Sequence, residues 1–169
     1  MSATATRTYL ELHDRSQLRP RRVDDETVRV DLVEQCAPAF WRSLYEGVGH
    51  PYHWVDRLPW TDRQITQYLS DPSVTLFVLS VGGSVAGYFE LQKHDDGSVE
   101  VAYFGLLPGY YGKGLGAHLL TEAAERAWDL SPSRVWLHTS TLDHAAALSN
   151  YRARGFRVVR TEEYAVPSI

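Results

Sequence analysis

Three alternating glycines, Gly112, Gly114 and Gly116, stand where an apolar run at 99–107 gives way to a helical pattern. Glycine lets the backbone approach a ligand without an intervening side chain. The first amide groups of a helix lack internal partners and lie at the positive end of its dipole. The spacing therefore predicts a phosphate-binding turn. Glycines that only turn the chain and seat the helix are an equal alternative.

Aromatic side chains are concentrated between residues 40 and 60. Flat apolar groups are typical of the walls of a small-molecule pocket, but two helices packed on a sheet would use the same residues. We expect the aromatic residues to divide evenly between these roles, with Trp41, Tyr45 and Trp54 in the pocket. Asp56 could bind a cationic amine there or cap a turn. The cluster comprises Phe40, Trp41, Tyr45, Tyr52, Trp54 and Trp60.

Charge and cysteine content exclude several classes of protein. The 169 residues carry a net charge of −4, whereas a nucleic-acid-binding protein normally shows a basic field. The basic run at 19–22 is followed at once by acidic residues at 24–26, so we expect a solvated connector. Cys36 is the single cysteine, which rules out an intrachain disulfide and favours a core residue over a nucleophile.

The histidines suggest no metal site. The pair His50 and His53 lacks acidic or cysteine partners at ligand spacing, and we expect His138 and His144 to be satisfied polar groups rather than catalysts. The small polar start at 1–8 is unlike a secretory signal, and the apolar runs are too short to span a membrane. These features favour a cytoplasmic protein without membrane or nucleic-acid partners, either a monomer or a homodimer.

Hydrophobic periodicity predicts the elements that would position these groups. Apolar residues recur every four positions in the helix after the glycines, with Glu122 and Arg126 as a favourable pair on its polar side. We expect a single domain over 1–169, with 1–6 frayed. Strands are predicted at 8–13, 28–33, 74–81, 84–93, 98–107, 134–139 and 156–164, and helices at 37–46, 62–70, 115–128 and 143–154.

The glycine loop resembles the coenzyme A pyrophosphate loop of the GNAT acetyltransferase superfamily, [Gln/Arg]-x-x-Gly-x-[Gly/Ala]. Here it is Tyr111-Gly112-Lys113-Gly114-Leu115-Gly116, so that Tyr111 departs from the first position. A later motif of the same family, Asn-x-x-Ala-x-x-x-Tyr-x-x-x-Gly-Phe, is similar to His144-x-x-Ala147-x-x-x-Tyr151-x-x-x-Gly155-Phe156, with histidine in place of asparagine. Together the two motifs place the resemblance over 74–165.

This resemblance implies an α/β fold with a single mixed, mostly antiparallel sheet and helices on both faces. The sheet would be splayed between the strand at 98–107 and the strand at 133–140, and the pantetheine arm of acetyl-CoA would lie in the gap. An N–H at or near Leu106 would polarise the thioester carbonyl. The implied cofactor-binding residues are Leu106, Leu107, Tyr111, Gly112, Lys113, Gly114, Leu115, Gly116, Ala117, His144, Ala147 and Tyr151.

The resemblance also implies the groups that move protons. Glu100 falls where some members of the family place a general base, and Glu90 on the neighbouring strand is a rival that would touch the substrate; a water relay could serve either carboxylate. Glu100 could equally be a solvent-facing strand residue. Tyr151 takes the position of the general acid near the thioester sulfur, or is a packed aromatic side chain.

The sequence therefore predicts an N-acetyltransferase that moves an acetyl group from acetyl-CoA to a primary amine of a small molecule, by direct transfer in a ternary complex and without a metal. One alternative is a protein or peptide N-acetyltransferase. An alternative from another class is a non-catalytic module that binds or senses acyl-CoA.

Overall fold

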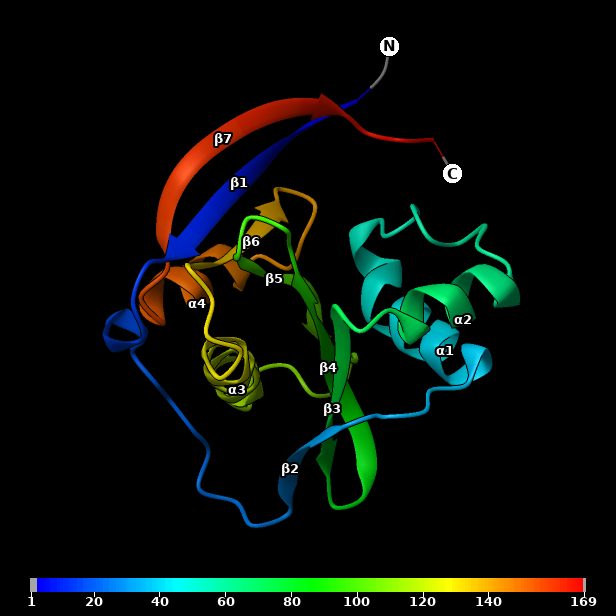
Figure 1. Ribbon diagram of the computed structural model, residues 1–169, viewed down its shortest axis with the longest axis horizontal. Coiled ribbons are helices and arrows are strands. Elements are labelled where there is room, and N and C mark those ends of the chain that lie inside the picture. Colours follow the sequence, from blue (N-terminus) through cyan, green and yellow to red (C-terminus); the bar gives the residue numbers. More distant parts are fainter. Residues whose placement is uncertain (1–2, 169) are drawn as a thin grey trace.

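The computed structural model describes residues 3–168, and within them the chain forms a seven-stranded sheet and four α-helices. Figure 1 shows the arrangement of these elements. The helices are α1 (Pro38–Gly49), α2 (Asp62–Ser70), α3 (Leu115–Trp128) and α4 (Ala147–Ala153). The strands are β1 (Thr4–Leu12), β2 (Val28–Leu32), β3 (Val74–Val81), β4 (Ser84–Lys93), β5 (Val99–Leu106), β6 (Val135–Ser140) and β7 (Arg157–Ala165).

The sheet has the order β2-β3-β4-β5-β6-β1-β7, and only its β5–β6 pair is parallel. That pair is short, because only Val99 opposite Val135 and Glu100 opposite Trp136 are in register. Beyond Glu100 the two strands part. The predicted mixed sheet and its splay are therefore confirmed, and the opening lies directly after Glu100.

Two cores flank the sheet, one on each face. Helices α3 and α4 cover one face, while α1 and α2 cover the other (Figure 1). Neighbouring residues of β4 serve opposite cores, because successive side chains of a strand point to opposite faces: Phe89 packs with α3, and Tyr88 packs with α1. Residues 86–91 of β4 are buried, so the strand beside β5 is covered on both faces.

Several local predictions are confirmed. The strands predicted at 74–81 and 84–93 are joined by a two-residue hairpin, in which Gly82 and Gly83 have φ angles of 57° and 84°, the left-handed pair that such a turn needs. Glu122 and Arg126 form their ion pair at 3.6 Å. The start of the last helix differs: α4 begins after Ala146 without a side-chain cap. Asp143 instead accepts hydrogen bonds from the Thr139 hydroxyl and the Ser140 amide.

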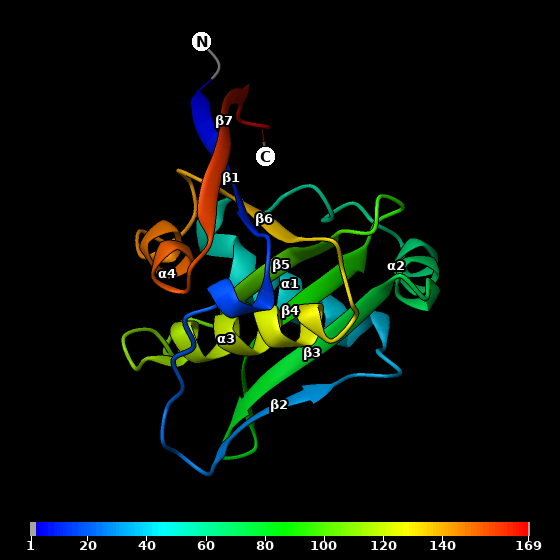
Figure 2. The ribbon, with the colours of Figure 1, turned by 60° about the vertical axis from the view of Figure 1, so that its left-hand side comes forward.

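The N-terminal strand is the largest departure from expectation. A strand was predicted at 8–13 with 1–6 frayed, but β1 begins at Thr4 and is paired on both sides, with β6 and β7. Residues 1 and 2 lie outside the described residues. Leu10 and Leu12 are fully buried, and their burial depends on partners more than 120 residues away in sequence. Figure 2 shows the β1–β7 pair rising beyond the rest of the sheet.

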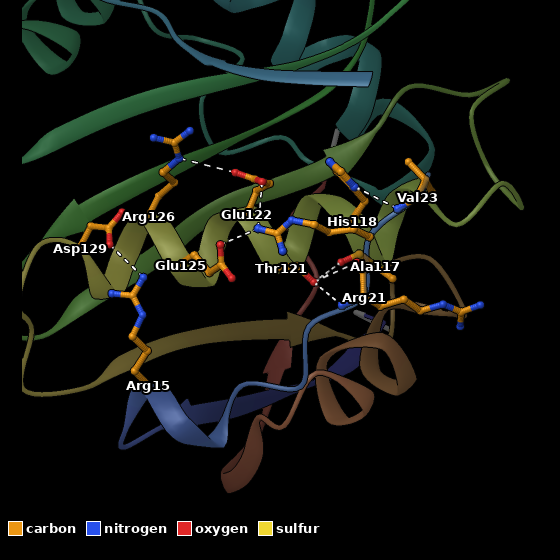
Figure 3. Close-up of polar contacts among 11 residues, drawn as sticks. Arg15, Arg21, Val23, Ala117, His118, Thr121, Glu122, Glu125, Arg126 and Asp129 are labelled. Atoms are coloured by element: carbon orange, nitrogen blue, oxygen red, sulfur yellow. Dashed lines mark hydrogen bonds and ion pairs between the residues drawn. The ribbon is translucent and has the colours of Figure 1, made fainter. Parts of the chain in front are cut away.

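The connector between β1 and β2 is not simply solvated, contrary to the expectation for 19–22. It lies across α3 (Figure 3), where Arg22 contacts Glu122 and Glu125, and Arg15 contacts Asp129. Exposed ion pairs contribute little. The backbone contacts matter more, because the amide of Arg21 donates to the Thr121 hydroxyl and that of Val23 donates to Nδ1 of His118. Burial lowers the pKa of His118, which keeps Nδ1 available as an acceptor.

Across residues 3–168, no helix is long and apolar enough to span a membrane.

Candidate active site

A cavity of about 600 Å³ opens where β5 and β6 part. Its walls come from β5 and β6, from the start of α3, from α4 and from the irregular segment 52–57, while Arg7 of β1 and Tyr164 of β7 close one side. Because it is built around a break in sheet pairing, backbone groups of the strands border the cavity as well as side chains. The two predicted motifs therefore converge on one space.

The glycine loop has the backbone that its sequence predicts. Gly112 and Gly114 have φ angles of 75° and 77°, a left-handed conformation that glycine adopts without strain. Gly114 is the N-cap residue of α3 and, having no side chain, supplies no capping hydrogen bond to the first amides of the helix. Lys113 is exposed, with its ammonium 5.7 Å from the Tyr110 ring. The loop therefore presents helix-terminal amides to whatever lies beside it.

Gly116 is not required for packing within the protein. A Cβ atom there would lie 3.7 Å from Nδ2 of Asn150 and 3.9 Å from a methyl of Leu106, ordinary contact distances. Gly116 and Ala117 line the cavity, so the missing side chain leaves room on the cavity side. Asn150, which the sequence analysis did not single out, donates a 3.1 Å hydrogen bond to the Gly116 carbonyl and ties α4 to the loop. Its position one residue before Tyr151 was the available signal.

The end of β5 separates two residues predicted to act together. The Leu107 amide donates to the Ala86 carbonyl at 2.8 Å and is committed to the sheet. Amide directions alternate along a strand, so the Leu106 amide points away from β4, toward the opening. Leu106 lines the cavity, whereas Leu107 packs with the α1 core. The prediction that Leu107 holds the pantetheine arm is therefore wrong, and Leu106 keeps that role as a prediction.

Glu100 lies on the cavity wall at the last position where β5 pairs with β6. It is only 8% exposed, with one carboxylate oxygen 2.9 Å from Nε2 of His94 and the other 4.0 Å from Nε2 of His138. Loss of solvation lowers the pKa of His138, against the opposing effect of the Glu100 carboxylate. The sequence analysis did not single out His94. Its contact with Glu100 forms where the turn between β4 and β5 folds back on β5.

Glu90 is not on the cavity. It is 0% exposed and accepts hydrogen bonds from Trp41 Nε1 at 3.0 Å, the Arg57 guanidinium at 2.9 Å and the Tyr68 hydroxyl at 2.7 Å. Although burial opposes it, the Glu90 carboxylate raises the pKa of Arg57. The prediction that Glu90 binds substrate or rivals Glu100 as base is therefore wrong, because its oxygens are enclosed in the core under α1.

The aromatic cluster divides between cavity and core. Tyr45 and Trp54 line the cavity, together with Tyr103 of β5 and the predicted Asp56. Trp41 does not: it is 1% exposed and stacks on Tyr45 at 5.4 Å. The pocket role predicted for Trp41 is wrong, because its indole is used to hold Glu90 in the core. Tyr103 faces Trp54 at 5.0 Å across the wall and was missed by the sequence analysis.

Tyr151 of α4 lines the cavity and packs against the C-terminal half of β5. Its ring packs edge-to-face against Phe104 and Phe156, with centroids at 6.0 Å and 6.4 Å. Burial raises the pKa of Tyr151 well above its ordinary value, assisted by the nearby Asp143 carboxylate. The phenol therefore keeps its proton throughout the neutral range, which is what a proton donor requires.

The comparison with protein families decides the assignment. A model described as the acetyltransferase (GNAT) family matches residues 34–156. The chain belongs to the GNAT family. Members of this family use acetyl-CoA, and the fold, the glycine loop and the cavity described above are consistent with it. The match begins after β2, so the interior strand β1 lies outside the matched residues.

Individual relatives of this GNAT chain are more distant. An uncharacterised N-acetyltransferase of Mycobacterium tuberculosis H37Rv is 32% identical over 104 residues, which cover 62% of this chain and 66% of that protein. A GCN5-related N-acetyltransferase from Kribbella flavida matches with a TM-score of 0.68 at 19% identity, over 96% of this chain and 58% of that one. An aminoglycoside acetyltransferase from a soil metagenome matches with a TM-score of 0.62 at 15% identity, over 77% and 88%. The chain thus spans about two thirds or less of the first two proteins.

Both departures from the GNAT motifs lie together in the structure. The ring of His144 is 4.8 Å from that of Tyr111 and 5.9 Å from that of Tyr52. All three residues line the cavity. The histidine and the tyrosine at these motif positions therefore form an aromatic contact that joins the glycine loop, the turn before α4 and the segment that precedes Trp54. Ala147, the next residue of the second motif, lines the same wall.

No group of three or more histidine, cysteine, aspartate and glutamate side chains within 3–168 has the arrangement of a metal site.

Nε2 of His53 lies 2.6 Å from the Pro167 carbonyl oxygen, which brings the C-terminal segment against the cavity wall. Burial raises the pKa of Cys36 to about 11, and the thiol is therefore a poor nucleophile.

Proposed function

We propose that this protein transfers an acetyl group from acetyl-CoA to the primary amine of a small molecule, directly and with both substrates bound. The observation that carries the proposal is the parting of β5 and β6 after Glu100, which opens a cavity from the glycine loop to that carboxylate. A single space is lined by the glycine turn, the phenol of Tyr151 and the carboxylate of Glu100. These are the groups that direct acyl transfer from a thioester needs.

The proposal places acetyl-CoA at the end of the cavity that the glycine loop borders. The amides of 112–117 would bind the pyrophosphate, and the space left by Gly116 lets the phosphates approach the start of α3. Lys113 adds an exposed positive charge beside the loop. The Leu106 amide, directed into the opening, would donate a hydrogen bond to the thioester oxygen and stabilise negative charge there. Tyr111, His144 and Ala147 would border the cofactor.

Two residues would move protons during the transfer. An alkylamine is protonated at pH 7, so Glu100 would take a proton from the bound ammonium, directly or through water, before the nitrogen attacks. Tyr151 would give its proton to the departing thiolate. The raised pKa of Tyr151 keeps the phenol neutral before that step.

The acceptor end favours a compact ligand. Tyr45, Trp54 and Tyr103 provide flat walls that could hold an amine cation by cation–π contact, and Asp56 adds a negative charge. The contact between His53 and Pro167 encloses one side of this space. An extended peptide would have to displace it. The cytoplasmic location and the monomeric or dimeric state expected from the sequence stay predictions.

Thiol release from acetyl-CoA tests the proposal against its alternatives. The acceptors are polyamines, aryl-alkylamines, amino acids, aminoglycosides and basic peptides. We expect release with at least one class of small amine. Release with basic peptides alone would replace the proposal with a protein acetyltransferase. Coenzyme A binding without release in any reaction would favour the non-catalytic module. Tyr151→Phe is the matched variant, expected to bind coenzyme A normally but to lose about 10²–10⁴-fold in kcat.

A further inference from the structure

Glu100 has an imidazole on each side. Its two carboxylate oxygens face different histidines, Oε1 toward His94 at 2.9 Å and Oε2 toward His138 at 4.0 Å. His138 lines the cavity together with Glu100, whereas His94 is not part of the cavity wall. The carboxylate therefore stands between the cavity and a side chain beyond it.

His94 is held in place and reaches solvent. It begins the turn between β4 and β5, and its amide donates to the Ser98 carbonyl at 2.9 Å. Its ring packs on Trp136 with centroids 5.4 Å apart, and the indole N–H of Trp136 donates to the Ser98 hydroxyl. The His94 side chain is 34% exposed, compared with 11% for that of Glu100. Imidazole is the side chain that gains and loses protons near neutral pH.

We propose that His94 is the proton exit of Glu100, so that the proton taken from the acceptor leaves through the β4–β5 turn rather than through the cavity. This inference rests on the proposed acetyl transfer. A bound acceptor would fill the space in front of Glu100, and the carboxylate itself has little contact with solvent. His94 gives it a second route that no substrate occupies.

The proton balance is as follows. An alkylammonium ion and acetyl-CoA give the N-acetylamine, the thiol of coenzyme A and one proton. Glu100 accepts that proton from the ammonium and becomes a neutral acid. With His94 as its Nδ1–H tautomer, Nε2 accepts the proton from the Glu100 acid, the resulting imidazolium releases its Nδ1 proton to water, and exchange with solvent restores the tautomer. Tyr151 loses a proton to the thiolate and regains the second proton of the attacking nitrogen, which leaves one proton per turnover for the exit.

The charges around the pair come from several elements. The cavity side holds His138, with Arg7, Asp143 and Glu162 acting on it from β1, the α4 approach and β7. In the turn, Asp95 is adjacent in sequence, and Asp96 is paired with Arg134, which also contacts Glu11 of β1. Lys93 precedes His94 in the chain. Gln92 lies opposite Glu100 in the β4–β5 register and is uncharged. His94 and His138 are thus the titratable groups whose nitrogens approach the carboxylate.

The test compares His94→Gln and His94→Ala with wild type, using the small amine that turns over fastest. An amide at 94 can still donate a hydrogen bond to Glu100 but cannot carry a proton. We expect kcat of His94→Gln to fall by about 10-fold, less than the ~10²–10⁴-fold of a full general-base loss. The affinity for coenzyme A should stay within about twofold, since His94 lies outside the cavity wall. Added imidazole should restore kcat of His94→Ala, with a pH dependence that follows the free base.

His13→Gln is the matched control, because His13 is an exposed histidine that pairs with Glu11 at 3.4 Å, outside the cavity. It should keep wild-type kcat and show no response to imidazole. Wild-type kcat in His94→Gln would overturn the exit, and so would a loss in His94→Ala that imidazole does not restore, because a purely structural role predicts that result. Absence of thiol release by the wild-type protein would refute the proposed function itself, a different outcome from failure of the exit alone.

Discussion

The hydroxyl of Tyr52 donates a 2.8 Å hydrogen bond to the hydroxyl of Tyr111, across a sequence separation of 59 residues. Tyr111 opens the glycine loop, and Tyr52 begins the segment that carries Trp54 to the acceptor wall. Burial raises the pKa of Tyr52, and the bond to Tyr111 adds to this effect, so the donor stays protonated. The bond therefore joins the glycine loop, at the proposed cofactor end of the cavity, to the segment that carries Trp54 at the proposed acceptor end.

Removing this bond should weaken the coupling between the two substrates. A neutral hydrogen bond contributes a net ~0.5–1.5 kcal/mol, so we expect Tyr52→Phe to reduce the mutual effect of acetyl-CoA and acceptor on each other's apparent affinity by about 2- to 10-fold. Initial rates over a grid of both substrate concentrations measure this coupling. Tyr111→Phe should have the same effect, and the double variant should add nothing. Strictly additive effects of the two changes would show that the hydroxyls act independently.

Gly116→Ala separates folding from cofactor binding. The new methyl would make only ordinary contacts with Asn150 and Leu106, and alanine is favoured over glycine in a helix by up to ~1 kcal/mol. Thermal stability should be unchanged or higher. The Kd of coenzyme A measured by calorimetry should rise by about 10-fold, because the methyl group would keep the pyrophosphate from approaching the backbone amide and so remove a hydrogen bond to a charged group. Gly83→Ala is the contrasting control. With φ of 84° in the β3–β4 hairpin, it should lose stability and keep its affinity.

Trp54→Ala should impair acceptor binding and Trp41→Ala should impair stability, although the sequence analysis assigned both residues to the pocket. Trp54 borders the acceptor space, so its loss should raise the KM of the acceptor by about 10-fold if cation–π contact holds the amine, with the KM of acetyl-CoA nearly unchanged. Trp41 is buried against Glu90, so its loss should cost about 3–5 kcal/mol of unfolding free energy. Urea titration and substrate kinetics on both variants distinguish the roles. A stable Trp41→Ala with a raised acceptor KM would return Trp41 to the pocket.

Glu90→Gln should be a stability variant and Glu100→Gln a catalytic one. Removing one partner of a buried ion pair costs about 3–5 kcal/mol, because Arg57 would keep a buried, uncompensated charge. Glu100→Gln should fold normally and lose turnover most at neutral pH, and less at high pH where the amine is already neutral. Denaturation curves and pH–rate profiles of both variants measure this contrast. A wild-type profile for Glu100→Gln would remove it from the base role.

Tyr88→Phe should stabilise the protein, most clearly in alkali. Within the described residues the fully buried Tyr88 hydroxyl has no hydrogen-bond partner, and such a group costs about 1–3 kcal/mol. Burial raises the pKa of Tyr88, with the Glu90 carboxylate adding to it. The folded state therefore binds a proton that the unfolded state releases above pH ~10, and stability falls as the pH rises past that point. Urea titrations at neutral and alkaline pH should show a smaller fall for Tyr88→Phe.

Local patterns in the sequence determine much of this protein. Hairpin glycines, strand alternation and helical periodicity depend on near neighbours, and they predicted most of the elements. The two motifs depend on spacings within one loop and one helix. They were sufficient to predict the GNAT family and to place Gly112, Gly116 and Tyr151 around one space, because a short turn and a single helix hold such residues at fixed separations. Glu100 lies outside both motifs and was added from the place that some members of the family give to a base.

Tertiary structure decided which residues of like chemistry face the cavity. Glu90 and Glu100 are both strand carboxylates, but Glu90 is enclosed by Arg57, 33 residues away in sequence, whereas Glu100 stands at the end of the β5–β6 pairing. Trp41 and Trp54 are separated in the same way by their packing. The pairing of β1 with β6 and β7 also joins distant segments. The contact of His94 with Glu100, only six residues apart, depends instead on how the turn between β4 and β5 folds back. Burial and pairing across strands depend on every element that packs there, so the position of one residue in the chain does not determine them.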